Sequence, residues 1–173
     1  PKDENVFRIF AQNANGLSPA SSSPDNQGFH ETFGYTQADV TTLSELNVHW
    51  RHVTEENKLH ARMSPWFDSL HQTLTYNTTN RPTGWYQIGG TAVFSVNKAC
   101  HRVMNQKGVD PSGLGRWCWT RYRGRDNLSL RVVSVYCPHD SGGDLSVYAQ
   151  HRQFFNQNGV QRIPRSAFWE DLC

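Results

Sequence analysis

Three segments of this chain that pattern as β-strands run directly into polar residues. Residues 6–12 alternate between apolar and polar positions, residues 39–46 are rich in β-branched side chains, and residues 128–137 form the second arm of a hairpin. Strand ends that converge on one rim of a sheet commonly assemble a functional site, so we predict a site there. The polar residues concerned are Asn13 and Asn15 after the first strand, Glu45 near the end of the second, and Tyr136 and His139 at the end of the third.

The first strand is predicted to aim both of its amides at the sheet side that it buries. Its apolar side chains are Phe7, Ile9 and Ala11. A period of two directs Asn13 and Asn15 to the same side as these residues. Each amide offers a donor and an acceptor, so the pair could bind a phosphate or orient a metal ligand. Asn and Gly are also ordinary turn residues, and a capped turn is the alternative interpretation.

The remaining elements are predicted from hydrophobic periodicity and from the glycine and proline positions. A helix over residues 54–70 has an acidic start, and Pro65 is expected to kink or end its first part. Gly89 and Gly90 open a buried strand, which indicates a close approach of another backbone. We further predict helices near residues 29–35, at 147–155 and from 167, strands at 74–76 and 88–96, and a hairpin with arms 115–123 and 128–137.

The first arm of that hairpin carries two aromatic residues followed by two guanidinium groups on one face. These residues are Trp117, Trp119, Arg121 and Arg123. Such a row could stack on bases and neutralise phosphates. A hydrophobic face with a solvated, charged end is the simpler interpretation.

Composition limits the classes of protein to which the chain can belong. Its 173 residues, 36% of them hydrophobic, suffice for one core, and the net charge of +2 with 18% charged residues excludes a disordered tail or a generally basic nucleic-acid wrapper. No apolar run approaches the ~20 residues of a membrane span, and the opening has no signal-peptide pattern. We therefore predict a soluble intracellular protein of the nucleus or cytoplasm, without membrane contact. The cysteines lack zinc-site spacing and are predicted to be reduced core residues.

Four motifs, in their order, resemble the endonuclease/exonuclease/phosphatase superfamily, which includes apurinic endonucleases, deoxyribonuclease I, inositol phosphatases and LINE-type retrotransposon endonucleases. The first is FAQNANGL at residues 10–17, and the second is TLSE at residues 42–45. GGTAV at residues 89–93 resembles the glycine-led central strand, and VYCPH at residues 135–139 resembles the Tyr-x-Pro motif. The wording of the first and last motifs is most similar to that of the retroelement endonucleases.

The resemblance implies a four-layer α/β sandwich that hydrolyses phosphate esters by in-line attack of water, with Mg²⁺ or Mn²⁺ as cofactor. Glu45 would be the metal ligand, and one carboxylate suffices because Mg²⁺ takes its other ligands from water and phosphate. Asn13 would orient that ligand or touch the phosphate, with Asn15 behind it. Tyr136 would hydrogen-bond a phosphate or leaving oxygen, and His139 would touch substrate. The structural alternatives are a solvated strand-end carboxylate for Glu45, a core tyrosine for Tyr136 and a turn residue for His139.

Two motifs of the superfamily are missing from the sequence. These are Gly-Asp-x-Asn, which contacts the nucleophile and phosphate, and a terminal Ser-Asp-His, which carries the catalytic histidine. GDLS at residues 143–146 follows the Tyr-x-Pro motif directly and lacks the asparagine. We therefore expect residues 1–173 to form a single partial domain without its carboxy-terminal part. Losing a general base or a metal-side group costs ~10²–10⁴ in rate, so the chain alone is expected to be inactive.

The function predicted for the parent protein is metal-dependent cleavage of nucleic acid, favouring DNA, within a retroelement polyprotein. Arg121 and Arg123 are the further candidates for substrate contact. One alternative is a phosphatase of small or lipid-like phosphate esters. Another is a catalytically dead binding or scaffold module that keeps the fold. The sequence leaves the oligomeric state open.

Overall fold

The computed structural model describes residues 3, 6–20, 22–78, 84–140, 142–144 and 146–173. The chain contains both strands and helices, and both types of element contribute to the core. The strands are β1 (Ile9–Asn13), β2 (Val40–Ser44), β3 (Leu70–Thr75), β4 (Thr91–Val96), β5 (Val103–Val109), β6 (Trp117–Arg123) and β7 (Ser129–Val135). The helices are α1 (Pro24–Thr36), α2 (Leu59–Met63), α3 (Val147–Gln157) and α4 (Pro164–Leu172), with short 3-10 helices η1 (Trp50–His52), η2 (Glu55–Asn57), η3 (Ser64–Trp66) and η4 (Asn97–Arg102).

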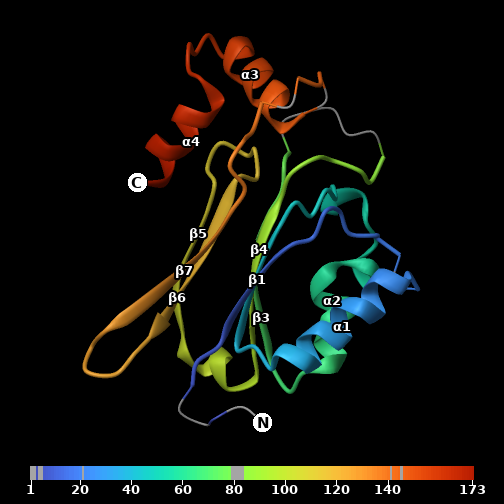
Figure 1. Cartoon of the computed structure of the whole chain (residues 1–173), viewed down its shortest axis with the longest axis vertical. Helices are drawn as coiled ribbons and strands as arrows, with labels where there is room; N and C mark the ends of the chain where they lie inside the picture. The colour runs from blue at the N-terminus through green and yellow to red at the C-terminus, as the bar shows by residue number, and fades with distance from the viewer. Residues whose placement is uncertain (1–2, 4–5, 21, 79–83, 141, 145) are drawn as a thin grey trace.

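The strands form two sheets that pack face to face, which confirms the predicted α/β sandwich (Figure 1). The first sheet has the order β1-β2-β4-β3, with β1 parallel to β2 and the other neighbours antiparallel. The second sheet is antiparallel, in the order β5-β6-β7. Helices α1 and α2 cover the outer side of the first sheet, and α3 and α4 lie beyond one end of the sandwich (Figure 1). Among the residues that the structure describes, no helix has both the length and the apolar character that a membrane span needs.

The inner faces of the sheets combine an apolar core with buried hydroxyl pairs. In β6 every second residue points inward, as the predicted alternation requires, and Cys118, Thr120 and Tyr122 are buried. The Thr73 and Thr120 hydroxyls lie 2.9 Å apart, and the Tyr122 hydroxyl lies 2.7 Å from the hydroxyl of Ser95. Such buried polar groups fix the register of one sheet on the other because each needs its partner.

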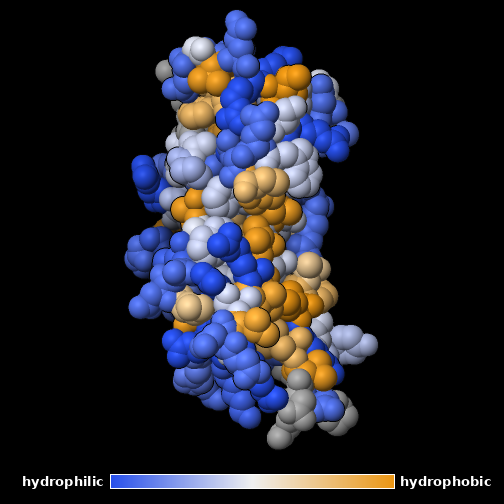
Figure 2. All heavy atoms as spheres, turned by 90° about the vertical axis from the view of Figure 1, so that its left-hand side faces the viewer, coloured by the Kyte–Doolittle hydropathy of each residue, from blue (hydrophilic) through white to orange (hydrophobic). Residues whose placement is uncertain are grey.

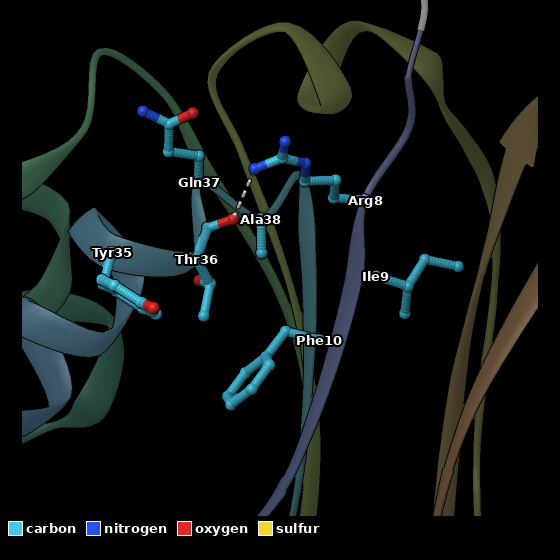
Figure 3. A pocket seen from close by; sticks show the side chains of 7 residues that line it. All are labelled: Arg8, Ile9, Phe10, Tyr35, Thr36, Gln37 and Ala38. Carbon is cyan, nitrogen blue, oxygen red and sulfur yellow. Dashed lines mark hydrogen bonds between the residues drawn. The ribbon is translucent and has the colours of Figure 1, made fainter. Parts of the chain in front are cut away.

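The prediction that the apolar side of the first strand is buried is wrong. Ile9 is 47% exposed, and Ala11 and Asn13 are also exposed. Ile9 pairs with Val40, whose side chain lies in the core between the sheets, so this side of β1 faces the same interior. The second sheet packs mainly on β2, β3 and β4, and this leaves β1 at the uncovered edge. Phe10 points to the opposite side, toward α1 (Figure 3).

A hollow of about 570 Å³ lies beside the start of this edge strand and contains no candidate site residue (Figure 3). Its only cationic lining residue is Arg8, whose Nη1 donates to the carbonyl of Thr36 at 3.2 Å. The hollow is therefore a gap between β1 and the end of α1, at the far end of the strand from Asn13.

The single helix predicted over residues 54–70 is also wrong. The segment consists of η2, the short α2 and η3, and β3 begins at Leu70, earlier than the predicted strand at 74–76. Lys58 is extended, with φ −63° and ψ 144°, and so separates η2 from α2. Pro65 opens the 3-10 turn that ends α2, because proline lacks the N–H that a continued helix needs. The predicted helices near 29–35, at 147–155 and from 167 are confirmed as α1, α3 and α4.

The predictions for the glycine pair and the cysteines have different outcomes. Gly90 has φ +96°, and a Cβ there would lie 3.3 Å from the carbonyl oxygen of Thr75, so the predicted close approach is confirmed. All four cysteines are free thiols. Cys118 is buried as expected, but Cys173 is exposed and does not belong to the core. The turn-forming residues of segment 77–84 predict a surface loop, and residues 79–83 of it lie outside the described residues.

A second glycine, Gly115, supports a stability prediction. It has φ +71°, and a Cβ there would lie 2.5 Å from the backbone carbon of Tyr76. We expect Gly115→Ala to lower the free energy of unfolding by about 2–4 kcal/mol, from backbone strain and overpacking together. Gly142 has a similar φ of +72° with no atom within 4 Å of an added Cβ, so Gly142→Ala should cost only about 1 kcal/mol. Urea unfolding of both variants tests this, and equal losses would contradict the contact at Gly115.

Candidate active site

Glu45 leaves β2 in a left-handed backbone conformation, with φ +54°. This conformation costs roughly 1–2 kcal/mol for a residue with a Cβ, so the surroundings must impose it. The carbonyl of Glu45 accepts a hydrogen bond from the N–H of Gly16 at 2.8 Å. On the other side, the N–H of Leu46 donates to the carbonyl of Gly90 at 3.3 Å. Two other segments of the chain thus hold the backbone around Glu45 from both sides. A backbone strained and held in this way is typical of a functional position.

The two asparagines of the first motif form a turn beside this residue. The side-chain oxygen of Asn13 accepts from the N–H of Asn15 at 2.8 Å, and Asn15 has φ +47°. The N–H of Ala14 donates to the carbonyl of Ser44 at 2.8 Å, so the turn lies against the end of β2. The capped turn is therefore present. Because the side-chain oxygen of Asn13 caps the turn, its amide N–H₂ is the group that remains to donate a hydrogen bond to a ligand.

Tyr136 reaches Glu45 across the two sheets. The Ser134 hydroxyl donates to the carbonyl of Leu43 at 2.7 Å in the buried interface. Tyr136 and Glu45 lie two residues beyond these partners, and the N–H of Tyr136 is fixed by the carbonyl of Arg116 at 2.7 Å. The Tyr136 side chain then lies close enough to the Glu45 carboxylate to interact with it electrostatically. The structure thus brings together two residues that are far apart in the sequence.

The environment of Tyr136 keeps its hydroxyl protonated. Burial, followed by the nearby charge of Glu45, raises the pKa of Tyr136 to about 12. A phenol with so high a pKa is a hydrogen-bond donor and a poor general base near neutral pH. It can therefore donate to a carboxylate or to a phosphate oxygen.

This contact can be measured in the chain itself. We expect Glu45→Gln to lower the pKa of Tyr136, because the neutral amide removes the charge that opposes the phenolate. A difference titration of ultraviolet absorbance against Tyr136→Phe isolates the group, which is necessary because Tyr122 also has a pKa of about 12. Glu31→Gln, on the exposed face of α1, is the matched control. An unchanged Tyr136 pKa in Glu45→Gln would show that the two side chains do not interact in solution.

The other candidate residues lie apart from this pair. His139 is exposed, three positions beyond Tyr136. Arg121 donates to the Ser129 hydroxyl at 2.9 Å and to the side-chain oxygen of Gln106 at 2.5 Å. Arg123 pairs with Ser129 at the far end of β6, whereas Trp117 pairs with Val135 beside Tyr136. Six residues of strand place Arg123 roughly 20 Å from that end.

The predicted row on the first arm of the hairpin shares the outer face of the second sheet, on which apolar and hydrophilic residues mix (Figure 2). The guanidinium of Arg131 lies over the Trp119 ring, 4.4 Å from its centroid. A Cβ at Gly108 would come within 2.3 Å of the same indole, so the ring lies directly on that glycine. These contacts occupy Trp119 within the sheet and favour the simpler interpretation of the row.

Two residues near the site were not predicted from the sequence. Asn47 has φ +55°, and its side-chain oxygen accepts from the N–H of Gly89 at 2.9 Å, which holds the loop after Glu45 in place. Tyr86 lies close enough to Tyr136 to raise its pKa electrostatically. The sequence feature that could have identified Asn47 as a site residue is its position two residues after Glu45. Tyr86 carries no periodic signal because it lies in a bridge of single residues, paired with Val48.

The site fits a metal ion that takes few protein ligands. The described residues contain no group of three or more His, Cys, Asp or Glu side chains that could hold a metal. Mg²⁺, however, is usually bound through one or two carboxylates, with water and phosphate as its other ligands. The partly buried Glu45 beside the Asn13 turn matches that requirement, whereas a zinc site would need more side-chain ligands.

Comparison with known proteins gives matches among solved structures only. No protein-family model matches the chain, and no curated protein sequence matches it. The AP endonuclease LMAP from Leishmania major superposes with a TM-score of 0.55 at 15% identity, covering 87% of this chain and 48% of that one. An AP endonuclease from Archaeoglobus fulgidus gives 0.52 at 13%, covering 88% and 49%. The 3'-5' exonuclease from Neisseria meningitidis gives 0.51 at 17%, covering 94% and 51%.

These likenesses define an α/β sandwich fold shared with two AP endonucleases and a 3'-5' exonuclease. The chain has the endonuclease/exonuclease/phosphatase fold, as the four motifs predicted. At these identities the likeness establishes the fold alone. The chain spans about half the length of the three matched structures.

Proposed function

We propose that this chain carries the metal-binding glutamate and the phosphate-binding tyrosine of a Mg²⁺-dependent phosphodiesterase that cleaves nucleic acid. The observation that carries the proposal is the juxtaposition of Tyr136 and Glu45 where the ends of β2 and β7 meet, two residues beyond the hydrogen bond from Ser134 to Leu43. A strained backbone at Glu45 and a fold shared with two AP endonucleases and an exonuclease support it.

Each residue then has a defined role. Glu45 would hold Mg²⁺ or Mn²⁺, and the ion, when bound, would supply charge neutralisation at the phosphoryl oxygens. Tyr136 donates its proton in a hydrogen bond to a phosphate oxygen, and it is suited to this because its pKa lies far above neutral. Asn13 contacts the phosphate through its amide donor, and Asn15 supports that turn. His139, exposed on the following loop, contacts substrate farther from the reaction centre.

We also propose that residues 1–173 are a single partial domain, which a carboxy-terminal part completes. The uncovered apolar side of β1 supports this, because an exposed Ile9 is expected to be buried in a complete sandwich. That part would supply the missing Asp, Asn and His groups, so the chain alone is inactive. The parent is proposed to be a retroelement polyprotein acting on DNA in the nucleus or cytoplasm, on the strength of its Asn-x-Asn-Gly-Leu and Tyr-x-Pro motifs.

The test is plasmid nicking by the complete protein, with Mg²⁺ and with excess chelator. Nicking that requires the metal supports the nuclease. Hydrolysis of a simple phosphomonoester without nicking would overturn it in favour of the phosphatase. A folded protein that is silent in both assays would overturn it in favour of a binding or scaffold module.

A further inference from the structure

We propose that Trp85 and Tyr86, together with Arg51 and His52, form a strand-binding patch that stacks on an unpaired base next to the phosphate held at Glu45. The inference rests on the proposed function and deepens it. It assigns the substrate class as a nucleic-acid strand with an accessible base, in place of a small phosphate ester. These four residues are called the patch below, and the strand that the patch binds is a nucleic-acid strand.

The aromatic half of the patch is unusually exposed. Trp85 is 45% exposed and Tyr86 is 44% exposed. Their rings pack edge to face, with centroids 6.1 Å apart and an interplanar angle of 81°. Two large rings that contact each other yet stay in water leave aromatic surface available to a base.

The backbone of this pair is fixed rather than loose. The N–H of His49 donates to the carbonyl of Trp85 at 2.6 Å, and Val48 forms a β-bridge with Tyr86. The N–H of Gln87 donates to the carbonyl of Asn47 at 3.2 Å. The rings are thus presented from a short ladder, so stacking on them requires little ordering of the backbone.

The ladder joins the patch directly to the active site. Its inner strand is the segment that follows Glu45, and Val48, which pairs with Tyr86, lies three residues beyond Glu45. Between them, the N–H of Asn47 donates to the carbonyl of Gly89 at 2.7 Å. A base on Trp85 or Tyr86 would therefore belong to a nucleotide adjoining the phosphate at Glu45.

Two exposed basic side chains lie on the element next to the segment that pairs with Trp85 and Tyr86. Arg51 and His52 lie exposed on η1, which begins one residue after the His49 that binds the carbonyl of Trp85. The rings of His49 and His52 lie 4.5 Å apart, so the imidazoles are adjacent. Single-stranded nucleic acid is bound by this combination, in which aromatic rings take bases and cations follow the backbone. A small phosphate ester has no base that could stack on the two rings.

The outer face of the second sheet is a weaker candidate for the same role. Its Trp119 is covered by Arg131 at 4.4 Å, and its Arg121 is engaged by Gln106 and Ser129. Arg121 lies toward the end of β6 that is remote from Tyr136.

The experiment measures binding of this chain to a short labelled oligothymidylate by fluorescence anisotropy, without metal or turnover. We expect Trp85→Ala to weaken binding roughly ten- to hundredfold and Trp85→Phe to restore most of it, because stacking needs a ring and not an indole. Tyr86→Ala should also weaken binding. Tyr35→Ala is its matched control, since Tyr35 is 91% exposed on α1 at the other end of the molecule. Arg51→Ala should reduce the salt dependence of binding.

A second probe separates bases from phosphates. An abasic oligonucleotide of the same length should bind the wild-type chain as weakly as the thymidylate binds Trp85→Ala, and DNA and RNA versions should both follow this pattern. Equal binding of the abasic and thymidylate strands, or no effect of Trp85→Ala and Tyr86→Ala, would overturn the patch. In that case metal-dependent nicking by the complete protein would still support the proposed function, so the two failures are distinguishable.

Discussion

Glu45→Gln is expected to abolish Mg²⁺-dependent nicking by the complete protein, with a loss of at least ~10²-fold in rate. Glutamine keeps the shape of the side chain and can still accept a hydrogen bond from Tyr136. It removes the negative charge that would hold the metal. The fold should be unaffected, because the charge of this partly buried residue is not needed for packing.

The control for this experiment is Glu31→Gln, which makes the same chemical change on the exposed surface of α1 and should leave nicking unchanged. Thermal unfolding of both variants checks that the loss is chemical. Full nicking by a folded Glu45→Gln variant would remove Glu45 from the metal site. Residual nicking that recovers at high Mg²⁺ concentration would instead support it, since weaker metal binding is then the defect.

The second large effect is expected at Arg116, which is 1% exposed. Its Nε lies 2.7 Å from one carboxylate oxygen of Asp110, and its Nη2 lies 2.9 Å from the other. The same Nη2 lies 2.7 Å from Asp171 on α4. Burial alone would raise the pKa of Asp110, but the hydrogen bonds and charge of Arg116 hold it below its ordinary value. Arg116 and Asp110 are thus both charged, and their side chains are fully buried.

We expect Arg116→Met to lower the free energy of unfolding by about 3–5 kcal/mol, because Asp110 would remain buried without its cation. Arg162→Met is the matched control. Arg162 pairs with the same Asp171 but is 31% exposed, so its loss should cost less than about 1 kcal/mol. Chemical denaturation of the two variants measures the difference. Comparable losses would mean that the buried pair contributes no more than a surface ion pair.

The ion pair of Arg116 with Asp110 also affects the candidate site. The carbonyl of Arg116 accepts a hydrogen bond from the N–H of Tyr136. The Arg116 side chain also donates to Asp171, which links α4 to the same residue. Disturbing Arg116 should therefore shift Tyr136 relative to Glu45, and the pKa of Tyr136 in a folded Arg116→Lys variant would report that shift. No motif in the sequence indicated that the end of β7 is supported in this way.

The local features of the site could be predicted from the sequence because they follow from short-range rules. The β-branched run before Glu45 forms β2, and the alternation of residues 117–123 separates an inner from an outer face. Gly90 marks a close backbone contact because only glycine leaves room for one. Strand period, glycine geometry and side-chain chemistry act over a few residues, so they are visible in the sequence alone.

Other features depend on contacts between distant segments. Residues 54–70 form three short turns in place of one helix, and Ile9 remains exposed because the second sheet does not cover β1. The sequence by itself determined that Glu45 and Tyr136 end their strands. Only the tertiary structure decided that they meet, because their contact depends on how one sheet is registered on the other through the bond from Ser134 to Leu43. No pattern within a single strand encodes that register.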